Sequence, residues 1–206
     1  IIMPDISYLA EQRDNVLGIV ATHAHEDHIG AIAPLWPMLR CPVYATPFTA
    51  RIVAGKLEEA GLGNKVKLRE VQVGGRLTLG PFTLDFISIT HSILEPNLLA
   101  IRTPLGVVAH TGDWKLDPDP LLGEKTDEAA IAKLGEEGVL AMVCDSTNAL
   151  NPGSSGSEKG VRDNLVSLVG TLKGRVAIAA FASNVARLDS AARAAKVNGR
   201  RLCLVG

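Results

Sequence analysis

The chain has 206 residues, of which 47% are hydrophobic and 21% are charged, and its formal net charge at pH 7 is −1. This length suits one ordinary domain or slightly more, and the composition excludes a chain that is disordered throughout. A net charge near zero excludes a molecule-wide field that attracts polyanions, so a nucleic-acid partner would have to be met by a local basic patch and by metal ions.

The cysteine content and the lack of targeting signals bear on location. Cys41, Cys144 and Cys203 are far apart and form no Cys-x-x-Cys pair, so we expect buried free thiols and a reducing compartment. No signal peptide and no bilayer-length apolar run is visible, which predicts a cytoplasmic protein without membrane contact. The chain starts with Ile, and both ends fall in segments that look ordered, so we expect a fragment of a longer protein.

Strands with few helices are expected in the first part of the chain. Apolar runs or apolar–polar alternation occur at 16–21, 41–45, 65–73 (weakly), 82–89, 98–103 and 106–110. Alternation at 82–89 is typical of a strand with one solvated or site-facing side, and 98–103 and 106–110 flank Pro104-Leu105 as a hairpin. Helical spacing is found at 46–60 and at 127–137, where Thr126 or Asp127 would cap the helix.

The pattern changes in the last third of the chain. Residues 139–144 are predicted to form a buried strand, and residues 148–159 form a loop rich in Gly, Ser, Asn and Pro. Helix and strand then alternate. The predicted segments are a helix at 158–172, a strand at 176–180, a helix at 184–196 and a strand at 201–205. This alternation is typical of a parallel, doubly wound sheet, so we place a domain boundary near Asn148.

The segment His23-Ala24-His25-Glu26-Asp27-His28 directly follows the first apolar run. On an extended backbone His23 and His25 point to the same side, and Asp27 and His28 come where the chain turns into the next helix. Imidazole and carboxylate ligands together favour zinc, with iron and manganese left open. The alternative is a polar surface loop, but three of the five histidines fall within six residues, which favours a metal site.

Two further ligand candidates stand at strand ends. His91 closes the alternating strand, and Asp113 follows the strand at 106–110. Loops at strand ends are where sites are assembled. Gly112 permits an unusual backbone angle just before the carboxylate. Either residue alone would more often be structural, but beside the first cluster we expect both to be ligands. His110 lies within a strand and is expected to be a hydrogen-bonded structural histidine.

These residues resemble the metallo-β-lactamase superfamily, in which the His-x-His-x-Asp-His pattern is highly specific, and within it the ribonuclease J family. The stretches that carry the resemblance are 2–9, 23–28, 90–93, 110–117, 144–149 and 181–187. The last two are similar to the start of the β-CASP domain that this group inserts into its metal-binding domain. The resemblance covers essentially the whole chain.

The resemblance implies an α/β fold. It consists of an incomplete metallo-β-lactamase αβ/βα sandwich at 1–148, without its N-terminal strands and C-terminal part, and the start of a doubly wound β-CASP domain at 149–206. It also implies two zinc ions. His23, His25 and His91 would hold one ion and Asp27 and His28 the other, with Asp113 bridging the two. A further histidine ligand, the late β-CASP histidines and an N-terminal aspartate of the family have no counterpart here, and Asp5 does not match that aspartate.

Two aspartates are assigned catalytic roles. Asp27 is expected to orient the attacking water, and by resemblance Asp145 would give a proton to the leaving oxygen. The residues alone favour a turn cap for Asp145, in Asp-Ser-Thr-Asn. Ser157 at the end of the glycine-rich loop and Ser183 or Asn184 are expected to be ordinary helix caps rather than phosphate sites.

The sequence therefore predicts a zinc-dependent ribonuclease that acts on RNA in processing, including rRNA processing, and in decay. Its mode could be endonucleolytic, 5′–3′ exonucleolytic or both, and the intact protein is expected to be a homo-oligomer. One alternative is another hydrolase of the superfamily, which acts on a thioester or a lactam. The other is a metal-binding fragment without activity of its own.

Overall fold

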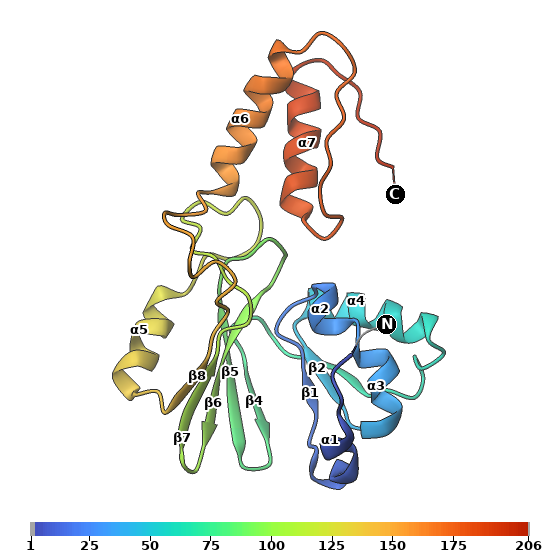
Figure 1. The fold of residues 1–206 in the computed structure, drawn as a ribbon, viewed down its shortest axis with the longest axis vertical. Coiled ribbons are helices and arrows are strands. Elements are labelled where there is room, and N and C mark those ends of the chain that lie inside the picture. The colour runs from blue at the N-terminus through green and yellow to red at the C-terminus, as the bar shows by residue number, and fades with distance from the viewer. Residues whose placement is uncertain (1–2, 206) are drawn as a thin grey trace.

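The computed structural model describes residues 3–205, so Ile1, Ile2 and Gly206 lie outside the described residues. The first residue of the stretch 2–9 and the last residue of the C-terminal strand and turn are among them. Two sheets face each other, and helices cover the outer face of each sheet (Figure 1). This is the four-layer arrangement that the sandwich prediction requires.

The smaller sheet has three parallel strands in the order β1-β2-β3. Its strands are β1 (Ile19–Val20), β2 (Val43–Ala45) and β3 (Leu68–Glu70), and the helices of this half are α1 (Ser7–Glu11), α2 (Glu26–Ile29), α3 (Ile32–Leu39) and α4 (Pro47–Glu59). Parallel neighbours need long crossovers, which α2 and α3 supply between β1 and β2 and α4 supplies between β2 and β3. In the central strand, Val43 pairs with Ile19 of β1 on one side and with Leu68 of β3 on the other.

The larger sheet has five strands in the order β4-β5-β6-β7-β8. They are β4 (Arg76–Leu79), β5 (Phe82–Ser88), β6 (Asn97–Thr103), β7 (Gly106–His110) and β8 (Ala141–Val143). Neighbours from β4 to β7 are antiparallel, whereas β8 lies parallel to β7 after the crossover helix α5 (Glu128–Glu137). Strands β5, β7 and β8 therefore run in one direction, and their carboxyl ends meet at one edge of the sheet.

Alternation along β5 and β6 fills two layers of core at once. Leu84 and Phe86 pack with Tyr44 of the other sheet, whereas Ile87 belongs to a cluster with Leu134 of α5. A third cluster lies between the small sheet and helices α3 and α4. On the side of β5 that the sequence suggested was solvated or site-facing, Ile87 packs toward α5, whereas Thr83 and Asp85 are only partly buried.

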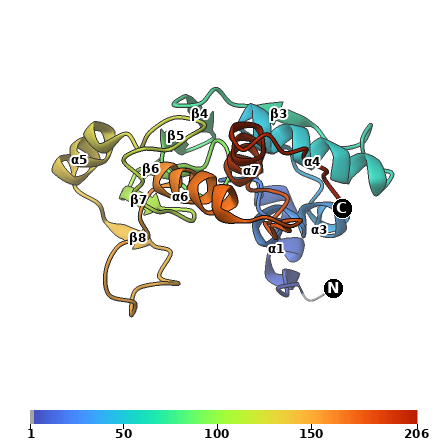
Figure 2. The same ribbon diagram turned by 90° about the horizontal axis from the view of Figure 1, so that it is seen from above.

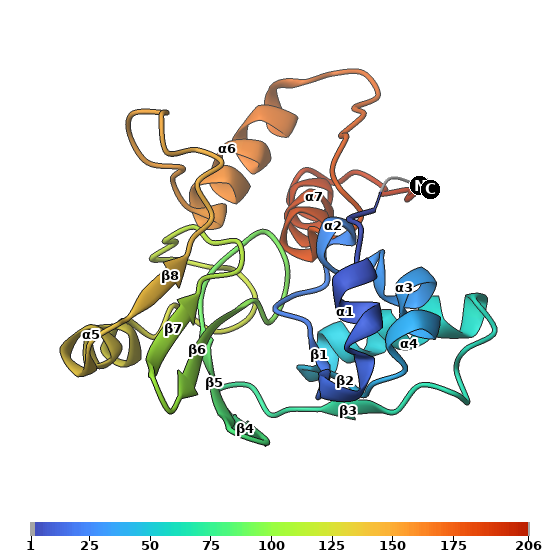
Figure 3. The ribbon, with the colours of Figure 1, turned by 60° about the horizontal axis from the view of Figure 1, so that its bottom comes forward.

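Helices α6 (Glu158–Thr171) and α7 (Val185–Val197) stand above the sandwich, while α4 and α5 lie on its opposite outer sides (Figure 2). Bonds between early residues of both helices and between late residues of both show that the two run in parallel. Ser157 accepts a hydrogen bond from the Gly160 amide and Asn184 from the Arg187 amide, so both predicted caps are confirmed. Figures 1 and 3 place the start of α7 next to α2.

The two strands predicted in this last part are not formed. Residues 176–180 and 201–205 have no ladder partner among the described residues, and without one an extended segment has no strand hydrogen bonds. Arg200 nevertheless donates to the carbonyls of Gly174, at 2.7 Å, and Leu172, so the beginnings of the two segments lie close together. The helices of the expected doubly wound unit are present, whereas its sheet is absent from residues 3–205.

Other expectations need correction. The first part of the chain has four α-helices before β3 and not few, and β1 has only two of the six residues predicted. The predicted buried strand at 139–144 is an exposed edge, because β8 pairs with β7 alone among the described residues, and Met142 is 64% exposed. Cys144 and Cys203 are exposed as well, whereas Cys41 is buried as predicted. Within residues 3–205, no helix combines the length and the apolar character that crossing a membrane requires.

Candidate metal centre

The topology of the larger sheet delivers three of the predicted site residues to one edge. His91 follows β5, Asp113 follows β7 and Asp145 follows β8, and these strands all end at that edge. The segments after β7 and β8 are joined directly, because the Asp145 amide donates to the Thr111 hydroxyl over 3.0 Å.

The histidine-rich loop comes from the other sheet. It leaves β1, passes through His23, which is fully buried, and enters α2, for which His25 is the residue before the first turn. Asn97 at the start of β6 holds this loop in place, because its backbone amide and its side-chain amide both donate to the Thr22 carbonyl at 3.1 Å. The loop therefore meets the edge of the larger sheet through a fixed backbone contact.

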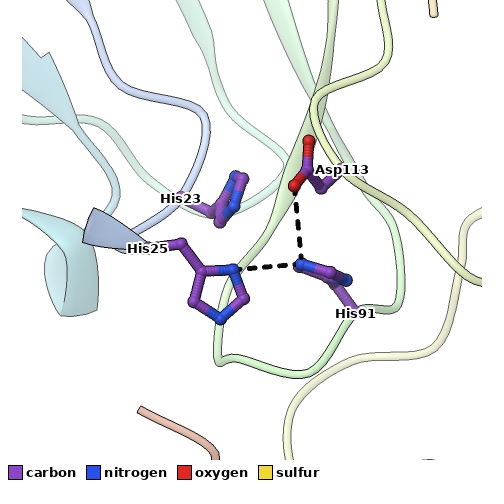
Figure 4. A group of neighbouring side chains, drawn as sticks. All are labelled: His23, His25, His91 and Asp113. Carbon is purple, nitrogen blue, oxygen red and sulfur yellow. Dashed lines mark hydrogen bonds and ion pairs between the residues drawn. The ribbon is translucent and has the colours of Figure 1, made fainter. Parts of the chain in front are cut away.

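Four of the predicted ligands form one group. His23, His25, His91 and Asp113 each offer a ligand atom, and these atoms all lie within 4.8 Å of one another. The side chains approach from three segments of the chain and converge (Figure 4). His91 Nε2 lies 3.1 Å from His25 Nδ1 and 3.9 Å from Asp113 Oδ2. Such a set of imidazoles and one carboxylate could hold a metal ion.

The remaining candidates form a second group that shares one member with the first. Ligand atoms of Asp27, His28 and Asp113 also lie within 4.8 Å of one another. His28 Nε2 is 3.3 Å from Asp113 Oδ2 and 3.5 Å from Asp27 Oδ2. The structure thus brings together all six residues predicted as ligands, in two groups that meet at Asp113.

Burial keeps the imidazoles of the first group neutral. Loss of solvent, followed by the neighbouring His28, His91 and His25, lowers the pKa of His23 from 6.5 to about 2. Burial also lowers the pKa of His91 to about 4, with His25 the next contributor, and it lowers the pKa of His25. Neutral imidazoles present nitrogen lone pairs, which is the form that binds metal.

One nitrogen atom of the first group, Nε2 of His23, indicates whether a cation fits this site. Thr22 Oγ1 lies 3.1 Å from His23 Nδ1, but the buried Nε2 of the same ring has no hydrogen-bond partner among the described residues. A buried nitrogen without a partner is costly, and a cation coordinated there would supply the missing interaction. The donor set and this unpaired atom both fit a bound metal.

The backbone conformation of Gly112 and its hydrogen bond to His110 position Asp113 after the end of β7. Gly112 has a φ of +58°, as the sequence suggested, and a Cβ there would lie 2.9 Å from the Asn97 carbonyl oxygen. Its amide donates to His110 Nδ1 over 3.1 Å. His110 belongs to neither group of ligand candidates, so its position agrees with the structural role expected for it.

Asp145 caps a turn at the edge of this site. Its Oδ1 accepts hydrogen bonds from the Thr147 amide at 2.9 Å and the Thr147 hydroxyl at 2.7 Å. The backbone bond from Thr147, followed by the side-chain bond, lowers the pKa of Asp145. Asp145 follows β8 at the same edge of the sheet as His91 and Asp113, and its charge partly opposes the lowering of the His91 pKa by burial. Asp145 therefore caps the turn and lies at the edge of the candidate site at the same time.

Sequence reasoning missed the polar groups that support the site. A network of charged side chains joins the segment after Asp113 to both upper helices, and its members are Lys115, Asp117, Glu158 and Arg187. Asp117 and Glu158 are buried. In the sequence, Glu158 was indistinguishable from any acidic residue in the first turn of a helix, so only its burial reveals the network.

The comparisons with known proteins agree with this geometry. Residues 4–134 match the model of the β-lactamase superfamily domain. Over its whole length the chain is 48% identical to ribonuclease J of Sinorhizobium meliloti and 41% identical to ribonuclease J 1 of Streptococcus pyogenes, and it spans 36% of each. It therefore covers about a third of these curated relatives. A crystal structure of an Enterococcus faecalis protein of unknown function is 16% identical, with a TM-score of 0.60 over 88% of this chain and 48% of that one, which supports the fold alone.

Proposed function

We propose that this chain, which belongs to the β-lactamase superfamily, is the metal-binding part of a ribonuclease that hydrolyses phosphodiester bonds in RNA. The observation that carries the proposal is the position of Asp113, which is shared by two groups of metal-ligand candidates. The similarity to ribonuclease J relatives over the whole chain supports RNA as the substrate.

We assign His23, His25 and His91 of the first group to one zinc ion. We assign Asp27 and His28 to a second zinc ion, with Asp113 as a ligand of both. A bound pair of such cations lowers the pKa of a water molecule and neutralises charge on a phosphodiester. The chain itself contributes neutral imidazoles that need no deprotonation before they bind.

Two aspartates handle protons in this proposal. Asp27 lies on α2 with a largely exposed side chain, so it can accept a hydrogen bond from the attacking water and orient it. Asp145 supplies the proton that the leaving oxygen requires. Because the bonds from Thr147 favour the ionised Asp145 carboxyl, it must take up that proton from solvent as the anionic phosphate arrives, since a nearby negative charge raises the pKa of a carboxyl group.

The distribution of charge favours RNA over a thioester or a lactam. Residues 149–206 contain nine Lys and Arg but only three Asp and Glu, whereas residues 1–148 contain twelve basic and nineteen acidic residues. The segment with α6 and α7 is thus strongly basic, and it stands above α2 and the larger sheet (Figure 1). A basic segment beside a hydrolytic site suits a polyanionic substrate, which meets the requirement for a local basic patch.

The test measures zinc content and RNA cleavage on the same protein. Protein equilibrated with zinc is expected to contain two zinc ions and to cleave a 5′-labelled RNA. A thioester and a lactam are expected to remain intact. The label also shows whether the products are endonucleolytic or arise from the 5′ end. Cleavage of the thioester or the lactam instead of RNA would overturn the substrate. Two bound ions without RNA cleavage would show that this chain has no such activity by itself. The β-CASP assignment of residues 149–206, the cytoplasmic location and the homo-oligomeric state remain predictions.

A further inference from the structure

We propose that Thr90 is a positioning residue that fixes the distance between His91 and Asp113 and so sets the geometry of the metal centre. The inference rests on the proposed metal site and extends it to a residue that binds no metal. Thr90 immediately precedes His91, is buried, and lies beyond the end of β5.

The need for such a residue follows from the order of the strands. His91 follows β5 and Asp113 follows β7, but β6 lies between these two strands. No ladder hydrogen bond therefore joins the two ligand segments. Beyond the ends of the strands, the Lys115 amide donates to the Thr90 carbonyl over 2.8 Å and closes this gap. This single backbone bond brings the segment after Asp113 against the segment before His91.

The hydroxyl group of Thr90 completes the connection. It donates to the Lys115 carbonyl and accepts from the Asp117 amide at 3.0 Å. Thr126 Oγ1 lies 2.9 Å from the same oxygen and accepts a hydrogen bond from the Thr90 amide at 3.0 Å. A hydroxyl group has one proton and two lone pairs, so Thr126 must be the donor in the contact between the two hydroxyls. Every hydrogen-bonding position of Thr90 Oγ1 is then occupied.

These contacts act on both ligand segments at once. The bonds to Lys115 and Asp117 hold the backbone two and four residues after Asp113, and Thr90 is covalently joined to His91. Valine has nearly the shape of threonine but lacks its hydroxyl group, so Thr90→Val leaves the Lys115 carbonyl and the Asp117 amide without their partner. The two ligand segments are then free to separate, whereas Thr90→Ser keeps all three contacts.

Cobalt provides a readout other than activity. Co²⁺ replaces zinc in sites of this kind, and the position and intensity of its visible absorption report the ligand geometry. Loss of a supporting contact behind a metal ligand typically weakens affinity by roughly 10- to 100-fold. We expect Thr90→Val to weaken Co²⁺ binding by about that factor and to change the spectrum of the bound ion, while Thr90→Ser restores the wild-type affinity and spectrum.

Thr49→Val is the matched control, because Thr49 is also buried but lies on α4 and has the Thr46 hydroxyl as its partner. Its Co²⁺ spectrum should equal that of the wild type. If wild-type protein binds no Co²⁺, the proposed metal site fails. If the wild type binds and Thr90→Val is indistinguishable from it, or Thr49→Val is equally changed, only the positioning role of Thr90 fails. Should Thr90→Val not fold, Thr126→Val removes the two hydrogen bonds between Thr126 and Thr90 and must still shift the spectrum; an unchanged spectrum would overturn the role.

Discussion

Oδ2 of Asp113 lies 3.3 Å from Nε2 of His28. His28 belongs to only one of the two ligand groups, whereas Asp113 belongs to both, so this contact joins the histidine-rich loop of the small sheet to the edge of the large sheet. A carboxylate has two oxygens and can serve two cations at once. The two groups are thus expected to depend unequally on these two residues.

Asp113→Ala should therefore empty both sites, whereas His28→Ala should empty one. Zinc content after equilibration with a fixed free zinc concentration checks this, and we expect about two ions in the wild type, one in His28→Ala and close to none in Asp113→Ala. His110→Asn is the control, since His110 belongs to neither group and an asparagine oxygen can still accept the hydrogen bond from the Gly112 amide. Equal losses in Asp113→Ala and His28→Ala would contradict a shared ligand.

The metal-free protein should lose stability as the pH falls below about 6.5. Folding lowers the pKa of His23 to about 2 and that of His91 to about 4. At a pH just below 6.5 these histidines therefore bind protons in the unfolded chain but not in the folded chain. Between pH 7 and pH 5 each histidine should lower the free energy of unfolding by roughly 2 kcal/mol. Stability falls further until about pH 4 for His91 and about pH 2 for His23.

Urea unfolding of the metal-free protein at pH 7 and pH 5 measures this loss. His91→Asn removes one of the three histidines whose pKa folding lowers, and should reduce the difference between the two pH values by about 2 kcal/mol. If His91→Asn shows the same change in unfolding free energy between pH 7 and pH 5 as the wild type, His91 is not one of the titrating groups.

Glu158→Gln should loosen the attachment of α6 and α7 to the sandwich. The Glu158 carboxylate is 3.3 Å from Lys115 Nζ and 3.2 Å from Arg187 Nη2, and its backbone amide donates to the buried Asp117. The neutral amide removes the negative charge that Lys115 and Arg187 contact. We expect the free energy of unfolding to fall by about 1–3 kcal/mol, because both cations are partly exposed. Faster hydrogen exchange in α6 and a lower melting temperature are expected.

Glu128→Gln is a control for that experiment. Glu128 is likewise the first residue of a helix, α5, but its side chain is exposed. It should change the melting temperature little, since only the interaction with the helix dipole is altered. A similar loss in both variants would mean that the helix dipole, and not the buried network, explains the effect.

Asp145→Asn should retain zinc and lose RNA cleavage if the carboxyl donates a proton, because an amide cannot replace it in that role. Thr147→Val removes only the hydroxyl bond to Oδ1 and keeps the carboxyl. The pKa of Asp145 should then rise toward its ordinary value, and cleavage should persist. Asp145 would be a turn cap alone if Asp145→Asn cleaves RNA at the wild-type rate.

The sequence predicted much of the local structure for physical reasons that need no tertiary context. The cap of α6 by Ser157 is a contact between residues close in the chain, and the hairpin of β6 and β7 follows from two short apolar runs around a turn. Residues 176–180 show the limit of such reasoning. Their composition favours a strand, but a strand forms only where a neighbour accepts its hydrogen bonds, and none lies beside them among the described residues.

The set of ligand candidates could be predicted from the sequence itself, because the spacing of His23, His25, Asp27 and His28 is local and strand ends mark His91 and Asp113. Only the tertiary structure placed Asp113 in reach of both groups. The same holds for Thr90, whose hydroxyl meets residues 25 and 36 positions away. Nothing in one segment fixes its distance to another segment. That distance is decided by the packing of two sheets and by the strand order that brings β5 and β7 to one edge.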